Sequence, residues 1–365
     1  MHIVIDARII SSSTGRYAES LLTNLEKLDT PHNYTVLVLR KDMNFWKPTK
    51  ANFKVVEADF PNYSFKEQLN YTLLLYRLKP DLVHFCMPQQ PLLYFGKRVT
   101  TVHDLTLVKY DNIDMNPLVY KIRKSIFIGL LRNVIWRSKM IVTPSNFVKK
   151  EIIDFTSMHH ASKIKTTHLA WDEAVADPKV IPELKNKRFI FFVGNAFPYK
   201  NLNTIVDAFS EVAKDMGDLQ LVFAGKKDYF YDQVEAHARE MGVLDKTHIL
   251  GFIPEGEKRW LFRNGQAYII ASYSEGFHIP GLEAMAEECP VISSNATCLP
   301  EVYDNAALYF NPDSSHELAS AITKVVENKK ERAELVKRGN KRLKDFSWQK
   351  MAKETLSAYN EALKK

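Results

Sequence analysis

The sequence predicts an α/β protein made of two doubly wound units, each a parallel sheet with helices on both faces. Its 365 residues are more than one hydrophobic core usually serves, which favours two domains. Short continuous apolar runs alternate with helical patterns, as expected for parallel strands that are buried on both faces. This alternation stops at residues 172–187, which are rich in Asp, Pro and Lys, and then starts again.

The first unit is expected to span residues 1–172. Its short β-branched runs predict strands, and its longer runs with apolar residues every three or four positions predict helices. The predicted strands are 2–6, 34–39, 82–85, 98–101 and 140–143, and the predicted helices are 15–28 and 118–137.

The second unit is expected to span residues 173–345 and to repeat this alternation. Ligands of open parallel sheets bind at the carboxyl ends of the strands, so we expect the active site in a cleft between the two units. The predicted strands are 189–193, 219–224, 248–250, 267–271 and 291–293, and the predicted helices are 202–214, 231–241, 258–262, 281–288 and 315–328.

A final helix is predicted over residues 346–363, where apolar residues recur at helical spacing. The spacing alone permits two placements: the helix closes the second unit, or it crosses back to the first.

Composition excludes several classes of protein. With 45% hydrophobic and 25% charged residues and no low-complexity tract, the chain is typical of soluble globular proteins. No internal repeat points to a solenoid or propeller. The longest apolar runs, such as 126–131, are too short to span a membrane, and no signal peptide is evident.

The cysteine content and the net charge indicate the expected compartment and the expected charge of a partner. Three scattered cysteines give neither a disulfide framework nor metal-ligand spacing, which favours the cytoplasm. The net charge of +7 suits an anionic partner such as a nucleotide, a lipid headgroup or a nucleic acid, without selecting one of them.

The strongest functional signal is EGFHIPGLEAM, residues 275–285. It follows a predicted strand, turns at Gly276 and leads through Pro280 into a helix. Glu275 is expected at the strand end and Glu283 in the first helical turn, beside an anion site made by loop N–H groups and the helix dipole. Each glutamate read alone is an ordinary turn or dipole-compensating residue. The combined spacing favours a site where both accept hydrogen bonds from sugar or ribose hydroxyls.

Two further loops carry candidate residues. In FVGNAFPYKNL a buried strand ends at Gly194, and Lys200 precedes a helix, where it could neutralise a phosphate or remain a solvated loop lysine. In SSSTGRYAES, Gly15 would permit close approach of a phosphate or sugar, and Arg16 could contact a phosphate or balance surface charge.

His103 ends a predicted strand in TTVHDL. There it could bind a substrate hydroxyl or transfer a proton, or it could simply be held by Asp104. The sequence has no Asp-x-Asp pair, no Cys/His cluster, no GxSxG elbow and no GxxxxGK[ST] loop, so we expect a metal-independent reaction without a cofactor.

Residues 121–139 carry six basic and no acidic side chains, with apolar positions at helical spacing. This pattern fits a core-facing helix with a basic outer side, or a helix in peripheral contact with an anionic membrane.

The motifs together resemble the retaining glycosyltransferases of family 4, which have the GT-B fold. The resemblance covers nearly the whole chain. It rests on GRYAESLL, TVHDL, VTPSNFVKKEI, FVGNAFPYKNL, FAGKKD, LGFIPEGE, EGFHIPGLEAM, CPVISSNATCLPEV and FSWQKMA, in this order.

The resemblance implies two facing Rossmann-like domains and a final helix, 346–365, that packs on the first. It implies that Glu283 binds ribose hydroxyls, that Glu275 binds the transferred sugar, and that His103 lies near the reacting centre with Lys200 on the diphosphate. The implied donor site comprises Gly15, Arg16, Gly194, Asn195, Lys200, Gly225, Lys226, Phe252, Ile253, Glu275, Gly276, Phe277, His278, Ile279, Pro280, Gly281, Leu282 and Glu283.

The chain departs from the family pattern at two positions. Family members often have a glycine where His278 stands and a basic residue where Asn195 stands. Neutralisation of the phosphates would then depend more on Lys200, with help from Arg16 or Lys226.

The resemblance implies transfer of a hexose from a nucleotide-diphosphate sugar to a glycan or lipid-linked saccharide, without a nucleic-acid partner. The pattern IDAR…GRYA with GN…KN is similar to mannosyltransferases and favours GDP-mannose. The alternatives are a UDP-sugar donor, a sugar-phosphate or glucan synthase, and a non-catalytic binder of sugar nucleotides.

Overall fold

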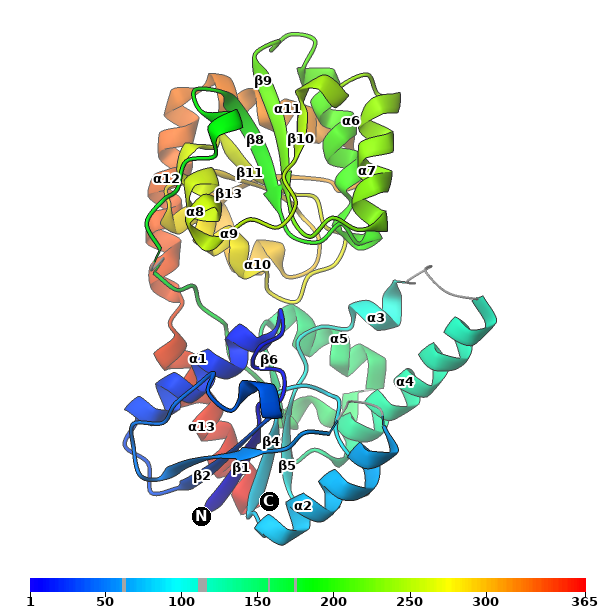
Figure 1. Ribbon diagram of the computed structural model, residues 1–365, viewed down its shortest axis with the longest axis vertical. Coiled ribbons are helices and arrows are strands. Elements are labelled where there is room, and N and C mark those ends of the chain that lie inside the picture. Colours follow the sequence, from blue (N-terminus) through cyan, green and yellow to red (C-terminus); the bar gives the residue numbers. More distant parts are fainter. Residues whose placement is uncertain (61–63, 111–116, 157, 174–175) are drawn as a thin grey trace. The chain divides into compact units, whose positions relative to one another are not determined.

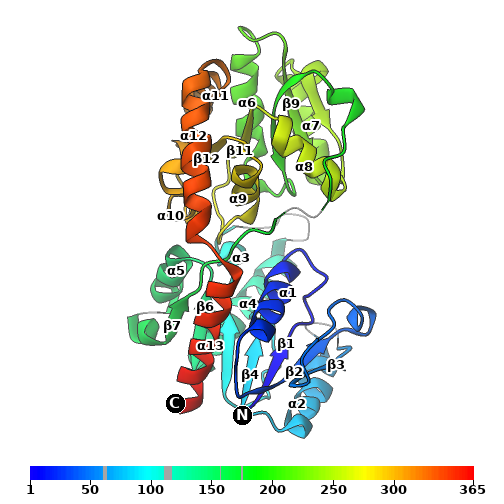
Figure 2. The same ribbon diagram turned by 90° about the vertical axis from the view of Figure 1, so that its left-hand side faces the viewer.

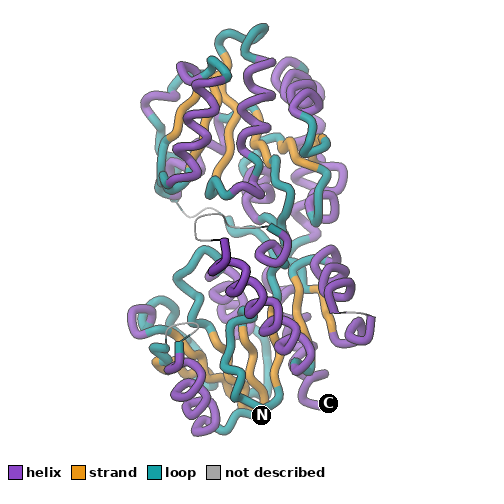
Figure 3. Tube along the Cα trace, turned by 90° about the vertical axis from the view of Figure 1, so that its right-hand side faces the viewer, coloured by secondary structure: helices purple, strands orange, loops and turns teal. Residues whose placement is uncertain are grey.

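The protein is described by a computed structural model that covers residues 1–60, 64–110, 117–156, 158–173 and 176–365 (Figure 1). It divides into unit 1, Met1–Leu169 with Ser347–Lys365, and unit 2, Ala170–Phe346. Residues 174 and 175 of the predicted linker lie outside the described residues. Each unit has one parallel sheet covered by helices (Figure 3), which confirms the predicted α/β class.

The sheet of unit 1 has seven parallel strands in the order β3-β2-β1-β4-β5-β6-β7. The order in which successive strands are added to the sheet reverses at β1, which lies between β2 and β4. The chain leaves β1 on one side and returns to it from the other, so the loops after β1 and β4 meet at the carboxyl edge. The strands are β1 His2–Asp6, β2 Asn33–Val38, β3 Phe53–Glu57, β4 Leu82–Phe85, β5 Arg98–Thr101, β6 Met140–Thr143 and β7 Ile164–Thr166.

Helices cover both faces of this sheet. Helices α1 and α13 lie side by side on one face (Figure 2). Right-handed crossovers place α2, α4 and α5 on the other face. The helices are α1 Gly15–Lys27, η1 Arg40–Asp42, η2 Glu67–Tyr71, α2 Thr72–Leu78, α3 Thr106–Lys109, α4 Pro117–Arg137, α5 Asn146–Thr156, η3 Met158–Lys163 and α13 Trp348–Lys364.

The final helix, α13, is held in unit 1 by polar bonds as well as by apolar burial. Its Tyr359 hydroxyl lies 2.6 Å from Nδ1 of His84 on β4, and both side chains are fully buried. Nε2 of His84 lies 2.9 Å from the hydroxyl of Thr101, which also meets the hydroxyl of Tyr17 on α1 at 2.8 Å. One network thus joins two strands to the two helices that cover them.

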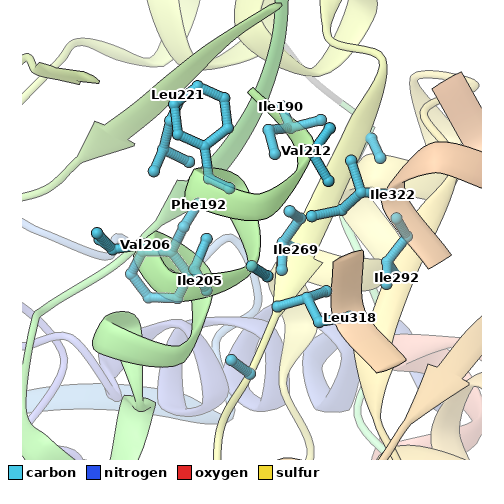
Figure 4. Packing of buried hydrophobic residues seen from close by; sticks show 14 of the residues in the cluster. Ile190, Phe192, Ile205, Val206, Val212, Leu221, Ile269, Ile292, Leu318 and Ile322 are labelled. Atoms are coloured by element: carbon cyan, nitrogen blue, oxygen red, sulfur yellow. The ribbon is translucent and has the colours of Figure 1, made fainter. Parts of the chain in front are cut away.

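The sheet of unit 2 has six parallel strands in the order β10-β9-β8-β11-β12-β13, and its reversal point is β8. Apolar side chains from β8, β9, β11 and β12 meet those of α6 and α11 in one cluster (Figure 4). The strands are β8 Arg188–Val193, β9 Leu219–Ala224, β10 Thr247–Ile249, β11 Ala267–Ile270, β12 Val291–Ser294 and β13 Ala307–Phe310.

The helices of unit 2 agree with the prediction except at their ends and in number. Residues 315–342 form two helices, and the second, α12, was not predicted. The helices are η4 Pro182–Leu184, η5 Pro198–Lys200, α6 Leu202–Val212, α7 Tyr229–Glu240, η6 Leu244–Lys246, α8 Glu255–Asn264, α9 Ile279–Ala286, α10 Leu299–Tyr303, η7 Asp304–Ala306, α11 Ser315–Glu327, α12 Lys329–Arg342 and η8 Leu343–Asp345.

Candidate functional site

The sheet order of unit 2 brings two of the predicted site residues into contact. Strands β8 and β11 are neighbours and run parallel, so the loops that follow them leave the sheet at the same edge. Lys200 comes from the first loop and Glu275 from the second, and Lys200 Nζ lies 2.7 Å from Glu275 Oε1. The two residues are 75 positions apart in sequence.

Both side chains of this pair are largely buried, with 12% of Lys200 and 10% of Glu275 exposed. The hydroxyl of Ser272 donates to the same carboxylate oxygen at 2.6 Å. Burial by itself would raise the pKa of Glu275, but Lys200, His278 and Ser272 outweigh it and hold that pKa below its usual value. Glu275 is therefore an ionised acceptor at neutral pH, held by a cation beside it.

Asn201 fixes the loop that carries Lys200. It has a left-handed backbone, with φ 59°, and directly precedes α6. Its side-chain amide donates to the carbonyl groups of Ala271 at 3.2 Å and Pro312 at 2.8 Å. The side-chain oxygen of Asn201, Oδ1, accepts from the Thr204 hydroxyl at 2.8 Å. The loop after β8 is thus tied to the end of β11, which positions Lys200.

His278 occupies the turn that starts α9. Its φ of 72° is left-handed, a conformation that costs a side chain with a Cβ roughly 1–2 kcal/mol. The hydroxyl of Tyr303 donates to the His278 carbonyl at 2.7 Å and lies 2.8 Å from its Nδ1. Burial lowers the pKa of His278 to about 4, so the ring is neutral at neutral pH. Nε2 lies 3.8 Å from Glu275 Oε1.

The prediction for the start of this helix was wrong by two residues. Helix α9 begins at Ile279, so Pro280 lies inside its first turn, and Glu283 is the fifth residue instead of a first-turn residue. The reason is the left-handed His278, which ends the loop two residues earlier than the Gly-Pro spacing suggested. The carboxylate of Glu283 lies 3.5 Å from Lys258 Nζ on α8, and the side chain of the N-cap residue, His278, makes no capping hydrogen bond to α9.

Glycines stand directly after β8 and β9 because the chain passes very close to itself there. A Cβ on Gly225 would lie 1.8 Å from the carbonyl oxygen of Gly194, which also accepts from the hydroxyl of Tyr231 at 2.7 Å. Asn195 and Lys226 follow these glycines and are exposed. The remaining donor candidates, Phe252 and Ile253, follow β10, and Phe252 is 82% exposed.

A close backbone contact, which the sequence did not reveal, explains why residue 15 is a glycine. A Cβ on Gly15 would lie 2.0 Å from the carbonyl oxygen of Ile10 and 2.6 Å from that of Ile9. The glycine therefore allows the loop after β1 to fold back on the start of α1. Arg16 follows in the first turn of α1 and is half-buried.

His103 follows β5, and the structure defines its tautomer. Nε2 lies 2.9 Å from the carbonyl oxygen of Cys86, so Nε2 must carry the proton and donate it. Nδ1 is then an acceptor. The Asp104 carboxylate accepts from the backbone N–H of Thr106 at 2.9 Å, and it acts on His103 through its charge, which works to raise the pKa of the ring. Burial lowers the pKa of His103, which favours the neutral ring.

Sequence reasoning missed the residues that support Glu275. Thr297 and Cys298 follow β12, the next strand of the sheet. The hydroxyl of Thr297 accepts from the Glu275 backbone N–H at 3.2 Å, and the thiol of Cys298 donates to the Glu275 carbonyl at 3.2 Å. Small polar residues directly after a strand were the available signal, in the motif SSNATCLPEV.

The described residues contain neither a cluster of metal-binding side chains nor a helix that could span a membrane. Among them, no group of three or more His, Cys, Asp or Glu side chains is arranged to hold a metal ion. No helix in the described parts of the chain is long and apolar enough to cross a membrane.

Comparison with known sequences finds similarity to glycosyltransferases. Residues 176–342 match the family model "Glycosyl transferases group 1". The chain is 27% identical over 276 residues to O-antigen chain mannosyltransferase B of Escherichia coli, covering 72% of this chain and 70% of that protein. It is 29% identical over 243 residues to O-antigen chain mannosyltransferase RfbU of Salmonella typhimurium, covering 64% and 67%.

Comparison with solved structures concerns the fold. Sucrose-phosphate synthase from Thermosynechococcus elongatus superposes with a TM-score of 0.75 at 15% identity, over 99% of this chain and 98% of that one. The lipopolysaccharide glycosyltransferase WaaG gives a TM-score of 0.69 at 14% identity, over 97% and 98%.

Proposed function

Because residues 176–342 match the family model of the group 1 glycosyltransferases and the chain has the GT-B fold, we propose that it transfers mannose from GDP-mannose, with retention of anomeric configuration. The acceptor would be a hydroxyl of a glycan or lipid-linked saccharide, in polysaccharide or glycoconjugate biosynthesis. The relatives from Escherichia coli and Salmonella typhimurium are both mannosyltransferases, which supports mannose as the sugar.

The observation that carries the proposal is the Lys200–Glu275 pair at the carboxyl edge of the unit 2 sheet. A diphosphate needs a cation, and a sugar needs an ionised acceptor for its hydroxyls. The two groups stand 2.7 Å apart, and Glu275 lies in the loop that leads into α9, a helix whose first N–H groups favour an anion. One sugar diphosphate could therefore meet all three features at once.

In the proposed reaction, the bond between the anomeric carbon and the phosphate oxygen breaks as positive charge develops on the sugar. The acceptor hydroxyl attacks from the face that the diphosphate leaves, and its proton passes to a released phosphate oxygen. Lys200 and the first turn of α9 would stabilise the negative charge on the diphosphate, which is usually the largest catalytic contribution. Glu275 would orient the sugar.

His103 has a separate role in this proposal. Its Nδ1 accepts a hydrogen bond, because Nε2 donates to the Cys86 carbonyl. A neutral histidine in this tautomer would bind a sugar hydroxyl and would not act as a proton donor at that atom. Substitution of His103 by Asn would then weaken donor binding more than it would change the pH dependence of turnover.

The base and sugar of the donor are tested by thermal unfolding in the presence of GDP-mannose, UDP-glucose and dTDP-glucose. A ligand that binds only the folded protein raises Tm, and the rise grows with its concentration above Kd. We expect GDP-mannose to give the largest rise. A larger rise with UDP-glucose would replace the donor assignment and favour the UDP-sugar alternative.

The acceptor class and the catalytic status need a second assay. Radiolabelled mannose should move from GDP-mannose to a lipid-linked or glycan acceptor. Transfer to a free sugar phosphate would indicate a sugar-phosphate synthase, and extension of a glucan would indicate a glucan synthase. Tight nucleotide binding without any transfer would indicate a non-catalytic binder.

We also propose that the reaction needs no metal, because Lys200 and the first turn of α9 supply the positive charge that a metal would otherwise provide. Turnover should persist in excess EDTA. The protein would act in the cytoplasm and meet its acceptor at the inner face of the membrane.

A further inference from the structure

One face of unit 1 exposes an unusual concentration of large apolar side chains. Seventeen such side chains are exposed among the described residues, and ten of them belong to three short segments: 64–80, 86–97 and 117–137. Contiguous exposed apolar surface of this kind marks an interaction site. The ten are Phe65, Leu69, Leu73, Tyr76, Leu93, Phe95, Val119, Ile122, Ile126 and Trp136.

Helix α4 contributes an exposed stripe. Val119, Ile122 and Ile126 follow one another at spacings of three and four residues, so they lie on one line along the helix. The core-facing side is different, since Leu131 and Ile135 are buried beneath it. The helix thus has an apolar inner side and a second apolar stripe directed outward, which a core-facing helix with a basic outer side would not have.

The connection from β4 to β5 explains why this face is open. Parallel strands are usually joined through a helix, but residues 86–97 include two prolines, Pro88 and Pro91, and form a loop. The loop leaves a hollow of about 260 Å³ between Gln68, Leu92 and Ile126. The three segments therefore border one surface.

The loop is held firmly, so its outward side chains have a fixed place. The guanidinium of Arg137 on α4 donates to the carbonyl groups of Leu92 at 2.6 Å and Tyr94 at 3.2 Å, and lies over the Phe95 ring at 4.2 Å. The Phe95 backbone N–H donates to the Tyr76 hydroxyl at 3.0 Å. Phe95 nevertheless remains 73% exposed.

The charge of this face selects the kind of partner. The three segments contain nine lysines and arginines and a single acidic residue, Glu67. Glu67 is buried and ion-paired with Arg8 at 2.9 Å, so it presents no negative charge to a partner. Lys66 and Lys121 are exposed beside the apolar residues. Apolar side chains flanked by basic ones match the interface of an anionic bilayer, whose lipids offer negative headgroups above hydrocarbon.

We propose that this face, the segments 64–80, 86–97 and 117–137, docks unit 1 on an anionic lipid bilayer. Ile122, Ile126 and Phe95 enter the headgroup boundary, and Lys66 and Lys121 contact the negative headgroups. A second copy of the chain would bring the same basic side chains, Lys66 and Lys121, against this face, which disfavours self-association through it. The proposal extends the proposed function by naming the surface that brings the enzyme to a lipid-linked acceptor.

The test is co-sedimentation of the full chain with vesicles of equal parts phosphatidylglycerol and phosphatidylcholine. The protein should pellet with these vesicles and much less with pure phosphatidylcholine, and rising salt should release it. Lys66→Glu with Lys121→Glu should weaken binding at least about 25-fold, taking about fivefold for each basic residue near the surface. Ile122→Ser with Ile126→Ser should abolish most of the remaining binding.

The matched control is Val180→Ser with Met241→Ser, which removes two exposed apolar side chains from unit 2. It should pellet like the unaltered protein. Circular dichroism and urea midpoints establish that each variant is folded. Transfer to a water-soluble acceptor should be unchanged in all of them, which separates failure of this proposal from failure of the proposed function. Equal pelleting of the Ile122/Ile126 variant and the control, binding without preference for anionic lipid, or a lipid-free dimer that the Ile122/Ile126 substitutions dissociate would overturn the proposal.

Discussion

Each unit holds a buried cation beside at least one carboxylate close to the central strands of its sheet, and the two arrangements differ in the kind of cation and in its exposure. In unit 1, the Arg8 guanidinium donates to both oxygens of Asp6, to Glu67 at 2.9 Å and to the carbonyl of Phe60 at 2.9 Å. It also lies 4.1 Å over the Tyr71 ring. Only 3% of the Arg8 side chain is exposed.

In unit 2, Lys200 meets Glu275 through one oxygen and keeps 12% of its side chain exposed. A planar guanidinium enclosed on every side holds a loop in place. An ammonium group on a flexible stem can shift from its carboxylate toward an incoming phosphate. This difference agrees with the proposed function, in which the cluster of unit 1 serves stability and the pair of unit 2 binds the donor.

The largest loss of stability is expected when the Arg8 cluster of unit 1 is broken. Arg8→Ala should reduce the free energy of unfolding by about 3–5 kcal/mol, because it leaves Asp6 and Glu67 as buried charges without a cation. Urea unfolding measures this loss of free energy. Arg40→Ala removes an exposed partner of Glu57 and should leave the midpoint unchanged. Similar midpoints for both variants would contradict the structural role of the cluster.

The second effect concerns turnover. Lys200→Ala should lower kcat about 10²–10³-fold, since it removes positive charge from the leaving diphosphate. Its free energy of unfolding should fall less than that of Arg8→Ala, because Glu275 keeps the Ser272 hydroxyl and its contact with solvent. Steady-state kinetics, with exposed Lys214→Ala as the control, measure the change. Near-normal turnover of Lys200→Ala would show that Lys200 does not bind the phosphate.

A third effect is a loss of stability in mild acid that arises in both units. Burial, with His103 nearby, lowers the pKa of His84 to about 3, and burial lowers the pKa of His278 to about 4. Between these values and the ordinary pKa of about 6.5, the unfolded chain binds protons that the folded chain does not, so stability falls as pH falls. Each histidine should cost about 2 kcal/mol at pH 5 relative to pH 7.

Glu275 does not contribute between pH 7 and pH 5. Its pKa lies below the usual value, so its stabilising effect is lost only at lower pH, as the folded-state carboxylate becomes protonated. Urea unfolding at pH 7 and pH 5 tests the assignment to histidine. His84→Gln should show a smaller drop than the unaltered protein, and an equal drop in both would assign the acid sensitivity to other groups.

The smallest effect is expected at His278. His278→Gly removes the left-handed strain, about 1 kcal/mol, and loses the bond from Nδ1 to Tyr303, also about 1 kcal/mol. Tm should therefore change little, while the relative Tm rises given by different nucleotide sugars should change. An unchanged ranking of donors would exclude His278 from sugar selection.

The prediction of fold and site succeeded where the pattern is local. Apolar strands, the class of the fold and the loops that carry Lys200 and Glu275 could be identified from short runs of residues. The contact between these two residues could not, because it depends on β8 lying next to β11, an order that no local pattern specifies. The start of α9 was misplaced because a histidine adopts a backbone conformation that usually belongs to glycine.

The exposed stripe of α4 was open to two interpretations for a related reason. Apolar residues at helical spacing look the same whether they face a core or a partner. Leu131 and Ile126 both belong to such spacing, yet the first is buried and the second is 57% exposed. The structure distinguishes them, because Leu131 packs in the core with Ile135 and Ile141 and Ile126 does not belong to that cluster.

The placement of α13 has a consequence for how the chain is made. Unit 2 is one continuous segment, Ala170–Phe346, and can fold as it leaves the ribosome. Unit 1 must wait, since Tyr359 and its neighbours Met351 and Ala358 fill its core and are synthesised after all of unit 2. During that interval the partners of α13 on α1 and β4 stay uncovered. Nascent unit 1 should therefore engage chaperones longer than unit 2, although its first residues appear earlier.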